Sequence, residues 1–229
     1  MLNKYVIGID VGGTHTRIGQ ISASGEVLKN QMLKTADYGN ATTFLEHLIG
    51  VIKTMISDDT EGFLGIGMGA PSVNEQNQTI TYAANLNWDG SLDIIQALSQ
   101  AFSVPVKLTN DANLLVLAHQ HYDDTLLSDF FVVTLGTGVG AGICCNGSLL
   151  KGKEGFAGEL GHVIVKDSGR SCSCGRKGSG GCRSFSSTLA SAENGRTSCF
   201  HRFVDTQILV SIWFLEWRLL HLFQRMRQL

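Results

Sequence analysis

Two stretches of the chain share one pattern: a β-branched apolar run, a glycine-rich turn and a second apolar run. The first is "KYVIGIDVGGTHTRIGQIS" at residues 4–22, and the second is "FFVVTLGTGVGAGICC" at 130–145. Runs of this composition next to glycine clusters are typical of strands joined by a tight turn. Because the pattern occurs twice, it indicates a weak internal duplication. We therefore expect an α/β fold of two related lobes with a cleft between them.

The segments between these hairpins fit the same α/β reading. The pattern of apolar residues predicts a third strand at 25–35 and two further strands at 63–71 and 104–111. It predicts three helices, at 41–56, 91–102 and 112–122. The first three strands predict an antiparallel meander. With 43% hydrophobic and 17% charged residues, the chain is typical of a globular protein. A net charge of −2 gives no indication of a nucleic-acid or anionic-membrane partner, and no membrane span is expected.

The first glycine turn does not fit a dinucleotide fingerprint, because a strand follows the glycines where that motif needs a helix. A glycine hairpin instead offers backbone N–H groups to an anion, here from Gly12, Gly13 and Thr14. Asp10 beside them would repel a bare phosphate unless Mg²⁺ lay between the two. An ordinary tight turn is the alternative for this stretch alone. Together, the two hairpins favour polyphosphate binding.

Four motifs in this order resemble the ROK family of bacterial sugar kinases and sugar-responsive repressors. They are "DVGGTHTR", "TNDAN", "LGTGVGAG" and "GFAGELGHV", and the likeness runs from about residue 5 to 182. The resemblance implies an actin-like (ribonuclease-H-like) two-lobed sugar kinase fold, with ATP, Mg²⁺ and a hexose meeting in the cleft. It implies a glucokinase-like transfer to the sugar 6-hydroxyl. It also implies that the phosphates are held by Asp10, Gly12, Gly13, Thr14, Gly136, Thr137 and Gly138.

Asp111 follows a predicted strand and begins a predicted helix. The residues alone leave two roles open, a helix cap or a general base that accepts the proton of a sugar hydroxyl. The resemblance implies the base. It further implies that the sugar is held by Asn85, Asn110, Glu159 and His162. From the residues alone, Asn85 could be a turn residue, Glu159 a surface residue and His162 a structural histidine.

One histidine and three cysteines have the spacing of a structural zinc site, which takes four nitrogen or sulfur ligands. They are His162, Cys172, Cys174 and Cys182. The N-terminus does not have the pattern of a secretion signal, so we expect a reducing cytoplasm, where clustered cysteines are more often metal ligands than disulfides. The ROK pattern would place the last cysteine earlier than here. We expect the zinc to order the loop that carries Glu159 and His162.

The resemblance ends near Cys182. The family continues with an apolar residue and a sugar-binding glutamate, whereas this chain has Arg183 and Ser184. No strand-turn-helix order is expected beyond this point, and losing two nucleotides would convert codons for Cys-Val-Glu-Ala into Cys-Arg-Ser. We hypothesise a frameshift here; a membrane- or partner-binding amphipathic helix is the alternative. Three parts of the chain are expected. Residues 1–110 form an N-terminal lobe, and residues 111–182 form the start of an incomplete second lobe with the zinc loop. Residues 183–229 form an atypical tail.

Three functions therefore stay open. The first is an ATP-dependent hexose kinase. The second is a sugar-binding regulator, although no DNA-reading helix-turn-helix is expected ahead of a first strand that starts by residue 4. The third is an inactive remnant of such a kinase. The identity of the sugar and the choice between monomer and homodimer are also open.

Overall fold

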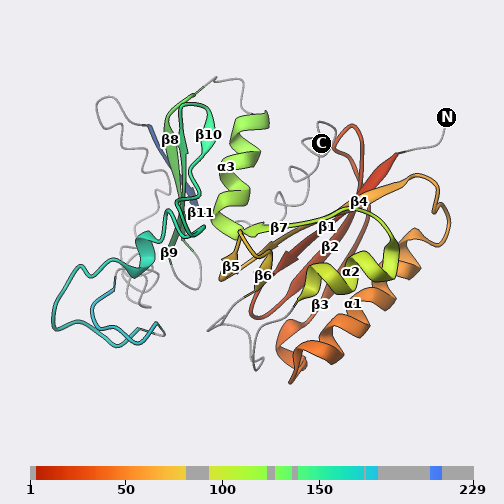
Figure 1. The fold of residues 1–229 in the computed structure, drawn as a ribbon, viewed down its shortest axis with the longest axis horizontal. Helices are drawn as coiled ribbons and strands as arrows, with labels where there is room; N and C mark the ends of the chain where they lie inside the picture. Colours follow the sequence, from red (N-terminus) through yellow and green to blue (C-terminus); the bar gives the residue numbers. More distant parts are fainter. Residues whose placement is uncertain are drawn as a thin grey trace, which may run out of the picture. The chain divides into compact units, whose positions relative to one another are not determined.

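The computed structural model describes residues 4–80, 93–122, 127–135, 139–172, 174–179 and 207–212 (Figure 1). The chain divides into two compact units at Leu114, and each is considered by itself. The helix α3 (Asp111–Tyr122) runs across this division. Several predicted site residues lie outside the described residues, namely Asn85, Gly136, Thr137, Gly138 and Cys182.

The first unit contains a five-stranded sheet with the order β3-β2-β1-β4-β7 (Figure 1). Its strands are β1 (Tyr5–Val11), β2 (Thr16–Ser22), β3 (Val27–Leu33), β4 (Phe63–Ala70) and β7 (Val106–Asn110). The pairs β1–β2 and β2–β3 are antiparallel, which confirms the predicted meander. The pairs β1–β4 and β4–β7 are parallel. The carboxyl ends of β1, β4 and β7 therefore meet at one edge of the sheet.

Two helices pack against this sheet, α1 (Ala41–Ile56) and α2 (Ile94–Phe102), and they lie side by side (Figure 1). The apolar residues of α1 recur every three or four positions, so one stripe of the helix enters the core. Phe44, Leu48 and Ile52 in this stripe are fully buried. Asn40 caps α1, since its Oδ1 accepts the N–H of Thr43 at 2.9 Å.

The helix α2 begins three residues later than its apolar pattern suggests. Its N-cap is Asp93, whose Oδ1 accepts the N–H of Gln96 at 3.0 Å. A capping carboxylate at this position stabilises a helix that starts with the next residue, Ile94. The first unit also contains three short elements that the sequence did not indicate, η1 (Thr35–Asp37), β5 (Val73–Asn74) and β6 (Thr79–Ile80). The strands β5 and β6 form a small antiparallel hairpin.

The second unit contains a four-stranded sheet with the order β10-β9-β8-β11. Its strands are β8 (Phe130–Leu135), β9 (Val139–Cys145), β10 (Ser148–Leu149) and β11 (Gln207–Ile212). The strands β10, β9 and β8 pair in antiparallel fashion, and β11 pairs in parallel with β8. The first sheet has the same arrangement in β3-β2-β1-β4. This repeated topology supports the internal duplication expected from the two glycine hairpins.

The strand β11 lies in the tail, for which no strand-turn-helix order was expected, and it shows that this tail contains a strand. It pairs in parallel with β8 from Gln207 opposite Phe130 to Ile212 opposite Leu135. The segment reads "QILVSI", and such β-branched composition favours a strand wherever a sheet edge is open to pairing.

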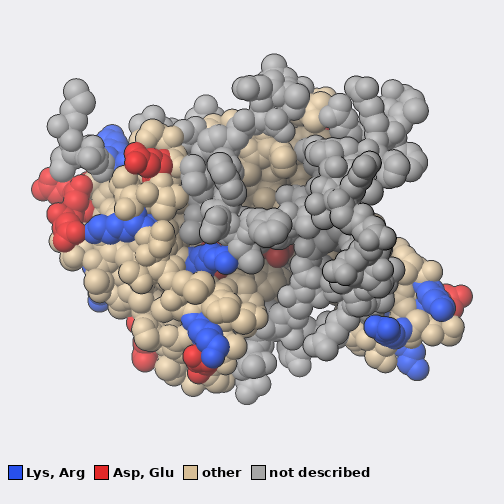
Figure 2. Space-filling model, turned by 180° about the vertical axis from the view of Figure 1, so that it is seen from behind, with Lys and Arg blue, Asp and Glu red and all other residues tan. Residues whose placement is uncertain are grey.

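The surface carries charges of both signs. Figure 2 shows one face, on which Lys and Arg side chains are interspersed with Asp and Glu side chains over the described residues. This distribution fits the net charge of −2. None of the described helices is both long enough and apolar enough to cross a membrane.

Candidate functional site

The turn between β1 and β2 forms the first part of the site. Its backbone is closed by the N–H of Gly12, which donates to the carbonyl oxygen of His15 at 3.0 Å. A Cβ on Gly12 would lie 2.8 Å from that same oxygen, so the close approach requires glycine. The N–H of Gly12 is thus engaged within the turn. Among the described residues the N–H groups of Gly13 and Thr14 donate no backbone hydrogen bond within this turn, so they could receive an anion.

Asp10 precedes this turn and is only 7% exposed. In the sheet it pairs with Arg17 of β2 and with Gly69 of β4. Gly69 in turn pairs with Thr109 of β7, one residue before the end of that strand. Adjacent strands are about 4.8 Å apart, so the backbones at Asp10 and Thr109 are separated by about 10 Å. Sheet register therefore places Asp10 and the segment leading to Asp111 at one edge.

The junction between β7 and α3 forms the second part of the site. Asn110 ends the strand and Asp111 begins the helix. The N–H of Ala112 is shared by the two side chains, at 2.9 Å from Asn110 Oδ1 and 2.8 Å from Asp111 Oδ1. The partial positive charge of a helix N-terminus stabilises a carboxylate there. Asn110 thus makes the cap-type contact with the helix, and the carboxylate of Asp111 accepts the next N–H, an arrangement compatible with a general base at Asp111.

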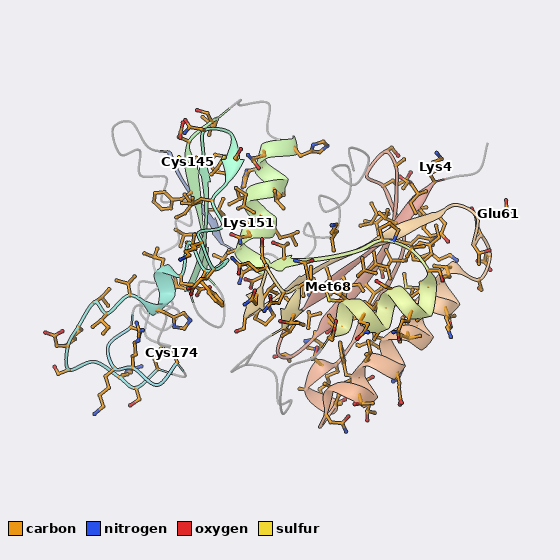
Figure 3. All side chains as sticks on the ribbon, viewed as in Figure 1. Lys4, Glu61, Met68, Cys145, Lys151 and Cys174 are labelled. Carbon is orange, nitrogen blue, oxygen red and sulfur yellow. The ribbon has the colours of Figure 1, made fainter. Side chains whose placement is uncertain are left out.

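Close packing joins this helix to the sheet. A Cβ on Gly69 would lie 2.9 Å from the Cδ2 atom of Leu114, in the first turn of α3. Glycine at this position of β4 therefore allows the helix to lie directly on the strand. Figure 3 labels the preceding residue, Met68, which is fully buried in the core of this unit. The start of α3 is consequently fixed by both hydrogen bonds and packing.

The segment carrying Glu159 and His162 lies in the second unit, on the short helix η2 (Leu160–His162) and at its N-cap. Two glycines bring it against β9. A Cβ on Gly158 would lie 2.5 Å from the carbonyl oxygen of Ala141, and one on Gly161 would lie 2.0 Å from that of Val139. These glycines therefore serve direct backbone packing. They hold Glu159 and His162 close to the glycine-rich strand.

His162 faces a carboxylate with one ring nitrogen and a thiol with the other. Its Nε2 atom lies 3.7 Å from Glu159 Oε2, and its Nδ1 atom lies 3.9 Å from Cys172 Sγ. A histidine that ligates a metal through one nitrogen is commonly oriented by a carboxylate at the other. Both side chains of the Glu159–His162 pair are almost half exposed, so ligands can reach them.

Three of the four predicted zinc ligands come together. One donor atom each from His162, Cys172 and Cys174 lies within 4.8 Å of the other two, and Figure 3 labels Cys174 on this loop. Zinc–ligand bonds of 2.0–2.3 Å put the donors of a tetrahedral site somewhat under 4 Å apart. A small contraction of the loop would bring the three donors to that spacing. These residues therefore fit a zinc ion.

Backbone hydrogen bonds shape the loop around these donors. The N–H of Cys172 donates to the carbonyl oxygen of Arg176 at 2.7 Å, and the N–H of Gly175 donates to the carbonyl oxygen of Cys172 at 3.0 Å. Gly175 and Gly178 have φ values of +83° and +74°, which favour glycine. A Cβ on Gly178 would lie 1.6 Å from the carbonyl oxygen of Lys166. The glycines of "CGRKG" are thus required by the fold of the loop.

Two polar residues that the sequence did not indicate, one buried and one half-buried, contact β7 and the β7–α3 junction. They are Glu75 and Gln78, in the turn of the β5–β6 hairpin, and they hydrogen-bond to residues 30 or more positions away. A local signal for such contacts is weak, because the turn "NEQNQ" reads as an ordinary polar loop. Its part in the site follows only from the tertiary structure.

The chain belongs to the ROK family, which matches residues 6–188. It is 29% identical over 184 residues to a glucokinase of Halalkalibacterium halodurans, covering 78% of this chain and 56% of that protein. It is 31% identical over 178 residues to a xylose repressor of Caldicellulosiruptor bescii, covering 76% of this chain and 44% of the repressor. The chain thus spans about half the length of the curated relatives it matches.

Solved structures agree with this assignment. The crystal structure of a ROK family glucokinase from Streptomyces griseus in complex with glucose and AMPPNP matches with a TM-score of 0.63 and 29% identity. The match covers 76% of this chain and 55% of the glucokinase. The predicted ROK resemblance and the predicted α/β fold of the actin-like sugar kinases are therefore confirmed.

Proposed function

We propose that this chain carries the catalytic base and part of the nucleotide site of an ATP-dependent hexose kinase with glucokinase-like specificity. The observation that carries the proposal is the single sheet edge at which the Asp10 turn meets the strand end that leads to Asp111, where the backbones at Asp10 and Thr109 are about 10 Å apart by strand spacing. That separation leaves room for a phosphoryl group and its acceptor. The relatives named glucokinase, and the solved complex with glucose and AMPPNP, support the choice of substrates.

In this proposal Asp111 accepts the proton of the sugar 6-hydroxyl as the hydroxyl oxygen attacks the γ-phosphorus of ATP, and the bond from that phosphorus to the bridging oxygen breaks to release ADP. A fixed carboxylate at a helix N-terminus suits this role, because its position is set before the sugar arrives. The N–H groups of Gly13 and Thr14 would bind phosphate oxygens, and Asp10 would hold Mg²⁺ through water. Mg²⁺ would neutralise the phosphate charge. Gly12 shapes the turn, and the second hairpin would contribute Gly136, Thr137 and Gly138.

The sugar would be bound by four hydroxyl-binding side chains, namely Asn85, Asn110, Glu159 and His162. A structural zinc held by His162, Cys172, Cys174 and Cys182 would fix the loop that presents Glu159. The support for this zinc is the convergence of three nitrogen and sulfur donors. Its chemistry would be structural, since the loop is held by few apolar contacts and its residues 163–165 are exposed.

A sugar-binding regulator is the second candidate function. The observation that favours it is the 31% identity to a xylose repressor, which is as high as the identity to the glucokinases. Both functions need sugar binding, and only the kinase needs Asp111 as a base. An inactive remnant of a kinase would show neither sugar-dependent turnover nor tight sugar binding.

The three candidates separate in two measurements on the purified full chain. The first is ADP release from MgATP in the presence of glucose, mannose, fructose, allose, N-acetylmannosamine or xylose. The second is calorimetric binding of the same sugars without nucleotide. Sugar-dependent ADP release supports the kinase. Binding of a sugar with no ADP release supports the regulator, and the absence of both would contradict the proposed function.

A further inference from the structure

The turn of the β5–β6 hairpin contacts the segment that carries Asp111. We propose that Glu75 in this turn is a positioning residue that holds the β7–α3 junction, and with it the carboxylate of Asp111, in the geometry needed for proton transfer. This inference rests on the proposed function, because it assigns to Glu75 an effect on a reaction at Asp111. The ordering of the junction by Glu75 can be measured without that reaction.

Glu75 is 8% exposed and makes three contacts with the junction through one oxygen. Its Oε1 atom accepts the hydroxyl of Thr109, the backbone N–H of Asn110 at 3.4 Å and the side-chain N–H of Asn113 at 3.1 Å. Thr109 and Asn110 end the strand, whereas Asn113 lies in the first turn of the helix. Glu75 therefore binds the chain on both sides of Asp111.

The chemistry of this contact favours a rigid junction. Burying a carboxylate is unfavourable unless hydrogen bonds compensate, and bonds to an ionised acceptor are about twice as strong as neutral ones. Once formed, the three contacts oppose any separation of strand from helix, because opening would leave a buried carboxylate with fewer partners. The hydrogen bond from Ala112 to Asp111 alone would not link the helix to a second element.

Gln78 binds the hairpin turn to Leu108, the residue of β7 that precedes Thr109. Its Nε2 atom donates to the carbonyl oxygens of Leu108 and Glu75, both at 3.0 Å, and its Oε1 atom accepts the N–H of Leu108 at 3.0 Å. Because β7 is an edge strand of the five-stranded sheet, the amide of Gln78 takes the place of a neighbouring strand. Gln78 has a φ of +54°, an uncommon value for a residue other than glycine. The turn is thus held at three consecutive residues of the strand.

Displacing the carboxylate of Asp111 should lower the rate of proton transfer more strongly than it weakens the binding of ATP at the β1–β2 turn. A displacement of about 1 Å can lower a rate by about a hundredfold. The turn that would bind ATP phosphates lies between β1 and β2 and makes none of its described hydrogen bonds to Glu75. Loss of the Glu75 contacts should therefore lower kcat and leave KM for ATP almost unchanged.

Three variants of the full chain test the proposal: Glu75→Ala, Glu75→Gln and, as a control, Asn77→Ala. Asn77 is exposed in the same turn and uses its backbone N–H, which alanine retains. For sugar-dependent ADP release we expect kcat to fall by about ten- to a hundredfold in Glu75→Ala, with KM for ATP changed less than twofold. Glu75→Gln keeps an acceptor oxygen of the same reach, so its loss should be smaller. Asn77→Ala should match the parent chain.

Hydrogen exchange by mass spectrometry gives a readout that does not need activity. In Glu75→Ala we expect faster exchange in peptides spanning 106–116, and unchanged exchange in peptides of α1, 41–56. If α1 also exchanges faster, the variant has lost its fold, and Glu75→Gln and Gln78→Ala decide by the same comparison. Unchanged exchange over 106–116 in Glu75→Ala, Glu75→Gln and Gln78→Ala would overturn the proposal.

The two proposals can fail separately. If the parent chain shows no sugar-dependent ADP release, the proposed function is wrong, and exchange over 106–116 still decides whether Glu75 orders the junction. If the parent is active and Glu75→Ala raises exchange there while kcat stays within twofold, Glu75 has a structural role only. That result would overturn the positioning role and leave the kinase intact.

Discussion

Replacing Gly161 by alanine isolates one steric contact that holds η2 against β9. The new Cβ would lie 2.0 Å from the carbonyl oxygen of Val139 and 3.0 Å from its carbonyl carbon. Carbon–oxygen contacts in proteins are normally about 3.3 Å or longer, so the two backbones would have to separate by more than about 1 Å. No rotamer change relieves the clash, because the Cβ position is fixed by the backbone of residue 161 and the atoms it meets are main-chain atoms of Val139.

The expected cost follows from this geometry. Overpacking of a well-packed site costs typically about 1–3 kcal/mol, and a backbone clash of this depth belongs in the upper part of that range. A loss of about 2–3 kcal/mol would raise the local opening equilibrium about 30- to 140-fold. Gly161 has no positive φ, unlike Gly158 at +89°, so alanine adds the clash without adding backbone strain.

Native-state hydrogen exchange measures this change directly. Peptides covering 139–145 and 158–165 should exchange about 30- to 140-fold faster in Gly161→Ala, and peptides of α1 should not change. Gly39→Ala is the matched control, because no atom lies within 4 Å of the Cβ it would add. Exchange within about threefold of the parent chain in both peptides would refute the argument, since it would mean that the two backbones separate at almost no cost.

Three further predictions concern single side chains. Burial and two nearby aspartates raise the pKa of Tyr5 to about 12, so the stability its neutral hydroxyl contributes is complete below about pH 10 and is lost as pH rises through 12; ultraviolet titration of the native chain should lose one late phenolate step in Tyr5→Phe, and an unchanged curve would contradict this. Burial raises the pKa of the Cys144 thiol, whereas its neighbour Cys145 is exposed, so peptide mapping after iodoacetamide treatment should find Cys145 modified first, and equal labelling would be the contrary result. Elemental analysis should find about one zinc ion per chain and less in Cys174→Ser, with Cys145→Ser as a control that retains its metal; a parent chain without zinc would refute the metal assignment.

Local sequence patterns predicted most of the regular elements of the first unit. The helix predicted at 41–56 is Ala41–Ile56, and the strand predicted at 63–71 is Phe63–Ala70. These predictions succeeded because apolar periodicity is a local property that the packed core preserves. The glycine hairpins also formed as predicted, as β1–β2 and β8–β9.

The errors occurred where distant contacts decide the outcome. The strand before Asp111 ends one residue earlier than predicted, because Asp111 is the first residue of α3 and the side chain of Asn110 accepts the N–H of Ala112 in the first turn of that helix. The hairpin β5–β6 and the role of Glu75 depend on contacts more than 30 residues apart. A polar turn of this kind has no periodicity from which such contacts could be inferred. For the same reason, the tail strand β11 became evident only through its pairing with β8.

The candidate site was only partly accessible from the sequence. Motif order indicated Asp10, Asp111 and the zinc ligands, and the register of three parallel strands then placed the first two at one edge. The division of the chain at residues 110 and 182, the roles of the individual site residues and the frameshift near Cys182 stay predictions. Sequencing the gene of a close relative would test the frameshift, which a relative with the same "CRS" and the same tail would contradict.

The central claim is that Asp111 is the base of a sugar kinase. The most direct measurement is kcat for sugar-dependent ADP release by the full chain and by Asp111→Asn, beside Asp37→Asn, which alters an exposed aspartate paired with Lys34. The account predicts that Asp111→Asn lowers kcat by about a hundredfold to ten-thousandfold, and that Asp37→Asn retains the activity of the parent. Equal rates for Asp111→Asn and the parent chain would contradict it.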